Sequence, residues 1–146
     1  MSCTALILAD DPAYKRTLAT LTVLDRLVIS THKAGLDKIQ VIHTGNPPKL
    51  TRTHALGIKV EILNKIPPVK EPTLLLAGNL TVRENDLIKV IGKRGRLYNH
   101  NREALPCGIT TEWRTNFDTS LPDLPKIETQ GTAKVVKDGL TAIQAE

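Results

Sequence analysis

Aromatic side chains are scarce in this sequence of 146 residues, where they make up 3% of the chain. With so few rings, the core must be built from leucine, isoleucine and valine, which suits buried parallel strands. The scarcity also argues against a surface that stacks the bases of single-stranded nucleic acid. We therefore expect no nucleic-acid partner. The aromatic residues are Tyr14, Tyr98, Trp113 and Phe117.

Cysteine is rare as well, and Cys3 and Cys107 are too far apart in sequence for a CxxC pair or a zinc-binding spacing. We expect both to be buried thiols of a cytosolic protein. The sequence also contains no GxGxxG fingerprint, Walker loop, GxSxG motif or HExxH motif. These absences argue against the standard cofactor sites and hydrolase centres.

Long apolar runs are missing too. The N-terminal run Thr4–Ala9 is too short for a secretory signal, and no stretch approaches the roughly 20 apolar residues that span a bilayer. We therefore expect a cytoplasmic chain, and its length fits a single domain over residues 1–146. The net charge of +5 fits either a solvated basic surface or a phosphate-bearing partner, such as a nucleotide or an anionic lipid surface.

The chain opens with a predicted strand–helix–strand unit between Thr4 and Gly45. The apolar run Thr4–Ala9 predicts a strand buried on both faces. An amphipathic helix of about five turns follows and ends at Gly35, as a left-handed C-cap requires. Lys38–His43 predicts a second strand, and such a crossover makes the two strands parallel. The helix is predicted from the spacing of Leu18, Leu21, Leu24 and Val28.

The same alternation continues to the middle of the chain. A short helix is predicted over Lys49–Leu56, ended by Gly57, and strands over Ile58–Leu63 and Pro72–Ala77. A helix follows over Val82–Ile91, with Thr81 as its N-cap. Its predicted inner face consists of Leu87, Ile88 and Ile91.

The last third of the sequence is predicted less regularly. Arg96–Asn99 and Leu105–Thr111 form a hairpin, Trp113–Lys126 a loop, and Ala133–Ala145 a final helix, so 113–146 are a loop plus a C-terminal helix. The fold class is α/β, a Rossmann-like three-layer domain with a mostly parallel sheet.

In an open parallel sheet, ligands bind outside the carboxyl ends of the strands. Four loops lie there: Ala9–Lys15, His43–Asn46, Leu63–Lys65 and Ala77–Leu80. The first leads from a strand into a helix, a usual place for phosphate, yet it contains no glycine. Its adjacent carboxylates, Asp10 and Asp11, repel phosphate unless a metal ion lies between them. Lys15 and Arg16 are either phosphate partners or solvated charges near the helix start.

The fourth loop contains Gly78 and Asn79. An aspartate in this place would suit magnesium, which prefers charged oxygen ligands, whereas Asn79 offers a neutral carbonyl or serves as a turn residue. No histidine has a metal-binding spacing, and His43 at a strand end is the best placed, although a structural role is the simpler interpretation. The predicted nucleotide-binding residues are Ala9, Asp10, Asp11, Gly78 and Asn79; the predicted catalytic residues are Lys15 and Arg16.

A group of basic residues surrounds the end of the helix predicted over Val82–Ile91. Cations are favourable near a helix C-terminus, so a solvated helix end is the simpler interpretation. Contact with an anionic membrane surface is the alternative. The group consists of Lys89, Lys93, Arg94, Arg96 and Arg102.

Taken together, these segments resemble the nucleotidyltransferases that activate sugars and polyols. In that family a strand and a basic-ended loop precede a helix that ends in Ala-Gly, and a later strand ends in Gly-Asp. More narrowly, the chain resembles the nucleotidyltransferase-like domain that precedes the membrane domain of CDP-alcohol phosphatidyltransferases. The matching segments are Thr4–Ala9, Leu21–Arg26, Lys33–Ile42, Leu74–Asn79, Arg83–Val90 and Leu105–Ile109.

The resemblance implies a nucleotidyltransferase-like fold and a cytoplasmic domain tethered to a membrane part that works in phospholipid biosynthesis. This chain departs from the family where the chemistry lies, because Asp11 and Ala13 replace the loop glycines and Asn79 replaces the metal-binding aspartate. The first hypothesis is a degenerate domain that binds a nucleotide or phosphorylated small molecule, or regulates the membrane enzyme. The second is an active cytidylyl- or other nucleotidyltransferase, with magnesium as its cofactor. An interaction domain of unrelated α/β type is the third.

Overall fold

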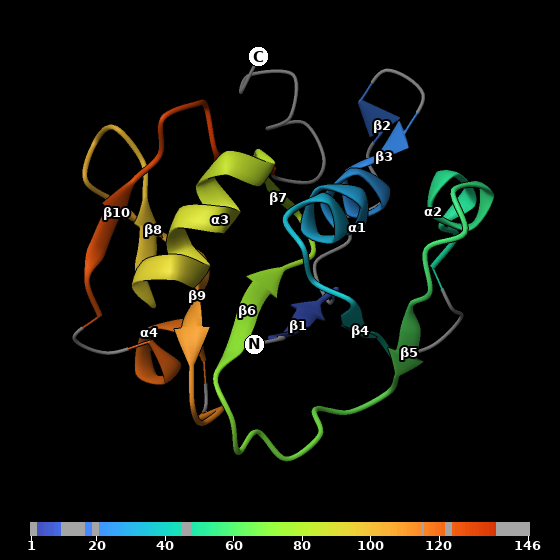
Figure 1. Ribbon diagram of the computed structural model, residues 1–146, viewed down its shortest axis with the longest axis horizontal. Coiled ribbons are helices and arrows are strands. Elements are labelled where there is room, and N and C mark those ends of the chain that lie inside the picture. Colours follow the sequence, from blue (N-terminus) through green and yellow to red (C-terminus); the bar gives the residue numbers. More distant parts are fainter. Residues whose placement is uncertain are drawn as a thin grey trace.

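The centre of the computed structural model, which describes residues 3–9, 17–18, 21–44, 48–114, 116–121 and 124–136, is a seven-stranded sheet (Figure 1). Its strands, in the order of the chain, are β1 (Thr4–Leu8), β4 (Lys38–Ile42), β5 (Glu61–Leu63), β6 (Thr73–Ala77), β8 (Arg96–Tyr98), β9 (Ala104–Thr110) and β10 (Lys126–Glu128). In space their order is β10-β8-β9-β6-β1-β4-β5, so β10 and β5 form the two edges.

The sheet is parallel in one half and mixed in the other. From β5 through β4 and β1 to β6, every pair of neighbours is parallel. β9 then runs antiparallel to both β6 and β8, and β10 is again parallel to β8. The predicted parallel pairing of the first two long strands is confirmed, with Thr4 opposite Lys38. The chain is therefore an α/β domain with a mostly parallel sheet.

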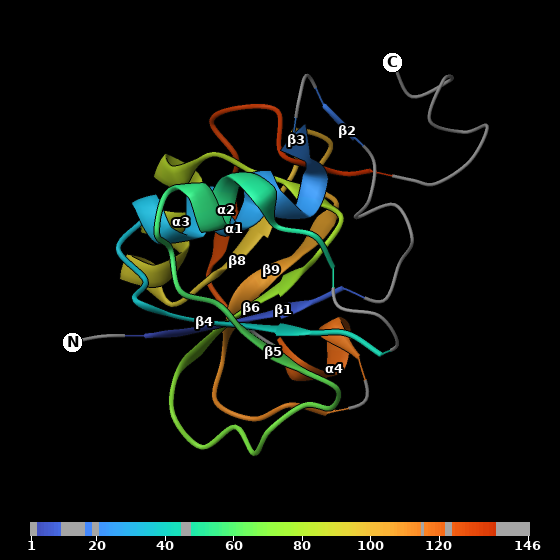
Figure 2. The same ribbon diagram turned by 90° about the vertical axis from the view of Figure 1, so that its right-hand side faces the viewer.

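The two faces of the sheet are covered differently (Figure 2). Helices α1 (Val23–Lys33), α2 (Thr51–Ala55) and α3 (Glu84–Lys93) lie on one face, while α4 (Phe117–Ser120) and the connection 64–72 lie on the other. Side chains of β1 alternate accordingly: Ile7 joins the larger core and Leu6 the smaller one. In the described part of the chain, the third layer of the predicted fold is thus one helical turn and extended chain, not a row of helices.

The first helix is shorter than predicted. Thr17–Leu18 (β2) and Leu21–Thr22 (β3) form a small antiparallel hairpin, and α1 begins only at Val23. The start is fixed by the side chain of Thr22, which accepts a hydrogen bond of 3.1 Å from the backbone N–H of Asp25. The predicted end is confirmed, because Gly35 has a φ of +104°.

The helix after β6 also begins later than predicted. Thr81 does not cap it: Leu80–Thr81 forms a short strand, β7, and the Thr81 hydroxyl donates to the carbonyl of Lys134. The prediction that Ile88 lies on the inner face is wrong, since Ile88 is 48% exposed while Leu87 and Val90 are fully buried. Ile88 follows Leu87 by one position, which turns it about 100° around the helix.

The C-terminal third differs most from prediction. The segment 113–126, predicted as a loop, contains α4 and ends at the first residue of β10. A reciprocal capping box between Asn116 and Thr119 stabilises the start of α4. The predicted helix over Ala133–Ala145 does not form at its start, because Lys134–Val135 is a strand, β11, antiparallel to β7. The buried Val136 packs against Val23; residues 137–146 lie outside the described part.

The remaining predictions hold in outline. A short helix, α2, lies within 49–56, and Gly57 after it has a φ of +74°. The strand predicted over Ile58–Leu63 is reduced to β5, and the hairpin of β8 with β9 is confirmed. No described helix is long and apolar enough to cross a membrane.

Candidate functional site

The carboxyl ends of the parallel strands meet at one edge of the sheet, as the sequence predicts. Hydrogen bonds continue the pairing one residue past the strands: the N–H of Ala9 donates to the carbonyl of Ile42 at 2.9 Å, and the N–H of Gly78 donates to Leu8 at 2.8 Å. The loops after β1 and β6 therefore leave the sheet side by side.

The strand order reverses between these two loops. After β1, the chain moves outward on one side to β4 and β5, and then returns to place β6 on the other side of β1. Such a reversal is a topological switch point, the place at which open α/β sheets bind their ligands. The helices that follow β1 and β6, α1 and α3, lie on the same face of this sheet (Figure 2). The switch point of this sheet lies between β1 and β6.

Gly78 brings the two strand ends into close contact. A Cβ atom added to Gly78 would lie 2.9 Å from the Cα and 3.0 Å from the Cβ of Ala9. Only glycine fits this spacing without a shift of the backbone. The structure thus brings together two of the predicted nucleotide-binding residues. The others in the first loop, Asp10 and Asp11, and the predicted catalytic pair Lys15 and Arg16 lie outside the described residues.

His43 ties the end of β4 to the same place. Its Nδ1 lies 2.8 Å from the carbonyl oxygen of Ala9. Since a carbonyl only accepts hydrogen bonds, Nδ1 carries the proton. The imidazole therefore holds the peptide group at which the first loop begins. The sequence marked His43 as the best-placed histidine, but its contact with Ala9 follows only from the register between β1 and β4.

Asn79 has a structural partner. Its side chain is buried, and the amide Nδ2 donates to the carbonyl of Val136 at 2.9 Å. The backbone N–H of Val136 donates in return to the carbonyl of Asn79 at 2.8 Å. This pair of bonds holds the residue after β11 against the carboxyl end of β6. The Nδ2 bond requires a donor that a carboxylate at position 79 would lack.

The predicted basic group does not form a single patch. Arg96 is buried, donates from Nε to the carbonyl of Leu105, and pairs with Asp118 at 2.9 Å. Arg102 lies in the turn between β8 and β9 and has a φ of +63°. Of the group, Arg94 remains with the two lysines at the end of α3, where its left-handed backbone closes the helix.

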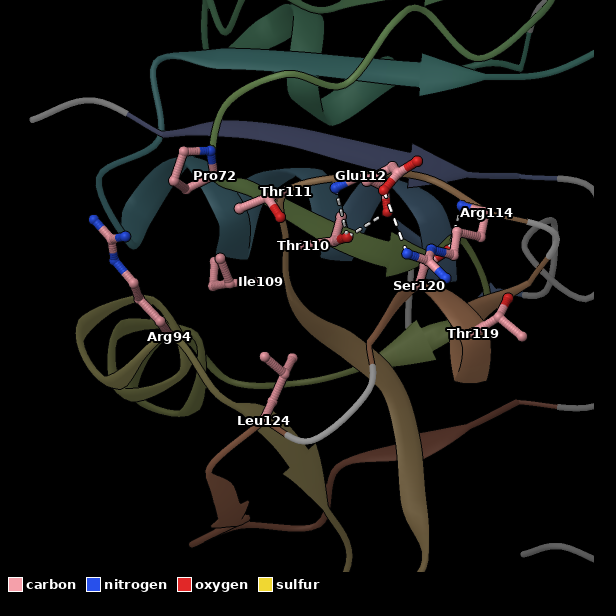
Figure 3. A pocket seen from close by; sticks show the side chains of 10 residues that line it. All are labelled: Pro72, Arg94, Ile109, Thr110, Thr111, Glu112, Arg114, Thr119, Ser120 and Leu124. Carbon is pink, nitrogen blue, oxygen red and sulfur yellow. Dashed lines mark hydrogen bonds and ion pairs between the residues drawn. The ribbon is translucent and has the colours of Figure 1, made fainter.

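A pocket of about 250 Å³ lies on the side of the sheet where the parallel strands begin, opposite their carboxyl ends (Figure 3). Pro72 before β6 and Thr110 at the end of β9 line it. Its polar groups largely bond to one another: the Thr110 hydroxyl donates to the carbonyl of Glu112 at 2.6 Å, and the N–H of Arg114 donates to the Ser120 hydroxyl. These bonds stabilise the turn after β9, so we assign this pocket a structural role.

Neither thiol is suited to nucleophilic chemistry. Cys107 is fully buried, and burial raises the pKa of its thiol far above 9.0, with the charge of Asp86 adding to the effect. Burial also raises the pKa of the half-buried Cys3 thiol. Within the described residues, no group of three or more histidine, cysteine or acidic side chains could hold a metal ion.

The fold and the strand ends together define an α/β domain with a topological switch point between β1 and β6. The sequence matches no protein-family model, and a search of curated proteins found no significant match.

Proposed function

We propose that this chain is a nucleotidyltransferase-like domain that binds a nucleotide or another phosphorylated small molecule without transferring a nucleotidyl group. The observation that carries the proposal is the topological switch point between β1 and β6, where Gly78 approaches the end of β1 at Ala9. Open α/β sheets bind their ligands at such a switch point. In the first loop, Lys15 and Arg16 are suitable partners for phosphate oxygens.

The loss of transfer chemistry is argued from Asn79. Magnesium in nucleotide sites prefers carboxylate oxygens, and in the family that the sequence resembles an aspartate corresponds to this position. Here the amide of Asn79 donates to Val136. A carboxylate in its place would face the carbonyl of Val136 and repel it, so the position is suited to holding β11. The absence of glycine from residues 10–16 removes the flexible backbone that usually cradles phosphates.

The biological setting follows from the resemblance alone. A domain of this kind would serve as the cytoplasmic, regulatory part of a CDP-alcohol phosphatidyltransferase-type protein in phospholipid biosynthesis. One contact supports a regulatory role: Asn79 holds Val136 beside the switch point. The chain after Val136 therefore starts next to the proposed ligand site, where a bound ligand can influence it.

The second candidate is an active, magnesium-dependent cytidylyl- or other nucleotidyltransferase that makes an NDP-polyol or NDP-sugar. The intact contact between Gly78 and Ala9 favours it, because this contact holds together the two strand ends at the switch point. A sugar or polyol phosphate would attack the α-phosphate of the nucleoside triphosphate, and pyrophosphate would leave. Lys15 and Arg16 would stabilise the charge that develops on the phosphate, and magnesium would clamp the phosphates.

Calorimetry with CTP separates the two candidates. It should be run with and without magnesium on the wild type, on Lys15→Ala and on Lys59→Ala, an exposed lysine before β5 that serves as the matched control. The proposal predicts that any binding is independent of magnesium, and that no pyrophosphate is released when a polyol phosphate is added. Micromolar CTP binding that requires magnesium and is lost in Lys15→Ala alone would establish the active enzyme instead.

A further inference from the structure

We infer that a groove between α1 and the start of α3 binds a phosphorylated small molecule at a site separate from the switch point between β1 and β6. The groove has a volume of about 490 Å³, within the range of small-molecule sites. Its walls come from α1, from the segment that leads from β7 into α3, and from Thr132 in the turn before β11. The inference does not depend on nucleotide binding at the switch point.

One wall of the groove is a polar stripe on α1. Arg26, Ser30 and Lys33 all line the groove. Their spacing of four and then three residues places them on one side of the helix, one turn above another. The stripe thus offers a cation near each end, about 10 Å apart along the axis, with a hydroxyl between them.

The opposite wall supplies a third cation. Arg83 precedes the first residue of α3 and lines the groove together with Asn85. The stem of its side chain lies near Gly131, where an added Cβ would lie 3.4 Å from the Cδ of Arg83. The Arg83 side chain is exposed, so its guanidinium is open to solvent. Arg83 therefore places a cation on the side of the groove opposite α1.

The charges that line the groove do not cancel. Glu84 is the one acidic residue among its described lining residues, against Lys33 and Arg83 on opposite walls. Two further carboxylates on the same helices are engaged elsewhere: Asp25 accepts bonds from Arg52 and Thr53, and Asp86 accepts from Thr129 and Gln130. In the described part of the chain, neither Lys33 nor Arg83 forms a salt bridge. The groove thus carries an excess of positive charge.

Buried side chains close the floor of the groove. They are Leu27, Leu80 and Ala133 of the larger core, and the partly buried Val82 beside them offers apolar surface to a ligand. Cations beside such a surface favour a ligand with a phosphate group and a carbon body, since phosphate pairs with the guanidinium and ammonium groups while the body packs against Val82. The ligand class is therefore a phosphate monoester of a small organic molecule, either free or as a lipid headgroup.

The test uses phenyl phosphate and inorganic phosphate as probes and follows backbone amide shifts by NMR. We expect saturable shifts at Asn85, Thr132 and neighbouring amides, with phenyl phosphate binding at least threefold more tightly than phosphate. Lys33→Gln and Arg83→Gln should each weaken binding about fivefold, and the double variant should abolish it. Raising the salt concentration should weaken it further. Lys59→Gln makes the same charge change outside the groove and should leave binding unchanged.

Three controls make the result decisive. Unchanged melting temperatures would show that the variants fold, and Arg83→Lys should restore part of the affinity. Flotation with vesicles containing phosphatidic acid distinguishes the two sources of phosphate: lipid binding that Lys33→Gln and Arg83→Gln abolish together assigns the headgroup. Equal affinity of Lys33→Gln, Arg83→Gln and wild type, or probe shifts confined to Ala9 and Gly78, would overturn the inference.

Discussion

The parallel and the mixed halves of the sheet differ in what they place at the carboxyl edge. In the parallel half, β5, β4, β1 and β6 all end there, so their loops lie at the same edge. In the mixed half, β8 and β10 also end there, but the reversed β9 ends at the opposite edge, where its last residues form the pocket around Thr110. A single reversed strand therefore distinguishes the two halves of the sheet.

Each half is also tied together by a buried aspartate in the first turn of a helix. Asp25 of α1 accepts the backbone N–H groups of Arg52 and Thr53, each at 2.9 Å, and the hydroxyl of Thr53. Asp86 of α3 accepts the hydroxyl of Thr129 and the N–H of Gln130. The first aspartate caps a helix, α2, whereas the second fixes the turn after β10.

Removing these carboxylates should have the largest effect on stability. We expect Asp25→Ala to lower the free energy of unfolding by about 3 kcal/mol, because it leaves three donors, two of them buried, without an acceptor. Asp86→Ala should cost about 2 kcal/mol, since it leaves two donors, one of them buried. Urea denaturation of both variants measures the difference. Equal losses, or a larger loss for Asp86→Ala, would show that the two halves are not held as we describe.

Disturbing the contact between Gly78 and Ala9 should have the second-largest effect on stability. Gly78→Ala places a Cβ 2.9 Å from a backbone atom, and we expect it to cost about 2 kcal/mol through overpacking. Gly92→Ala is the matched control, because Gly92 lies in α3 with nothing within 4 Å of its added Cβ. That variant should gain about 0.5–1 kcal/mol from helix propensity. Thermal unfolding that moves both variants in the same direction would contradict the assignment.

The smallest predicted effect concerns Cys107 on the reversed strand. Burial raises the pKa of its thiol above the ordinary value of 9.0, so above that pH the unfolded state loses the proton first. The protonated Cys107 thiol therefore makes its full contribution to the free energy of unfolding below pH 9. Above that pH the contribution declines by about 1.4 kcal/mol per pH unit for one proton.

The wild type should therefore lose stability more steeply above pH 9 than Cys107→Ala, as urea denaturation at several pH values would measure. Cys3→Ala should change the slope less, because the Cys3 thiol is only half-buried. Identical slopes for the wild type and Cys107→Ala would show that the thiol is not shielded from water.

The parallel half was predictable because its signals are local. The apolar run at Thr4–Ala9 and the stop at Gly35 determine a strand and a helix end with little help from the rest of the chain. The positions of Ala9 and Gly78 at strand ends were predictable for the same reason. What the sequence did not contain is the register that joins Ala9 to His43, because register depends on how whole strands pair.

The errors fall where pairing between distant segments decides the structure. Threonine is a common helix N-cap, but the hydroxyl of Thr81 donates to the carbonyl of Lys134, 53 residues away. Val135 lies in the stretch predicted as a final helix, yet it pairs with Leu80 in β7. In both cases a strand of two residues outweighs local propensity, and nothing local in the sequence reveals the partner.

Whether a nucleotide binds at the switch point is tested most directly by mapping the amide shifts that CTP causes. The protein is titrated with CTP, and shifts are followed at every assigned residue. We expect the largest amide shifts at Ala9, His43 and Gly78, around the switch point between β1 and β6. These shifts should be lost in Lys15→Ala. Saturable shifts confined to the opposite edge, around Thr110 and Arg114, would contradict it, as would no shifts at millimolar CTP.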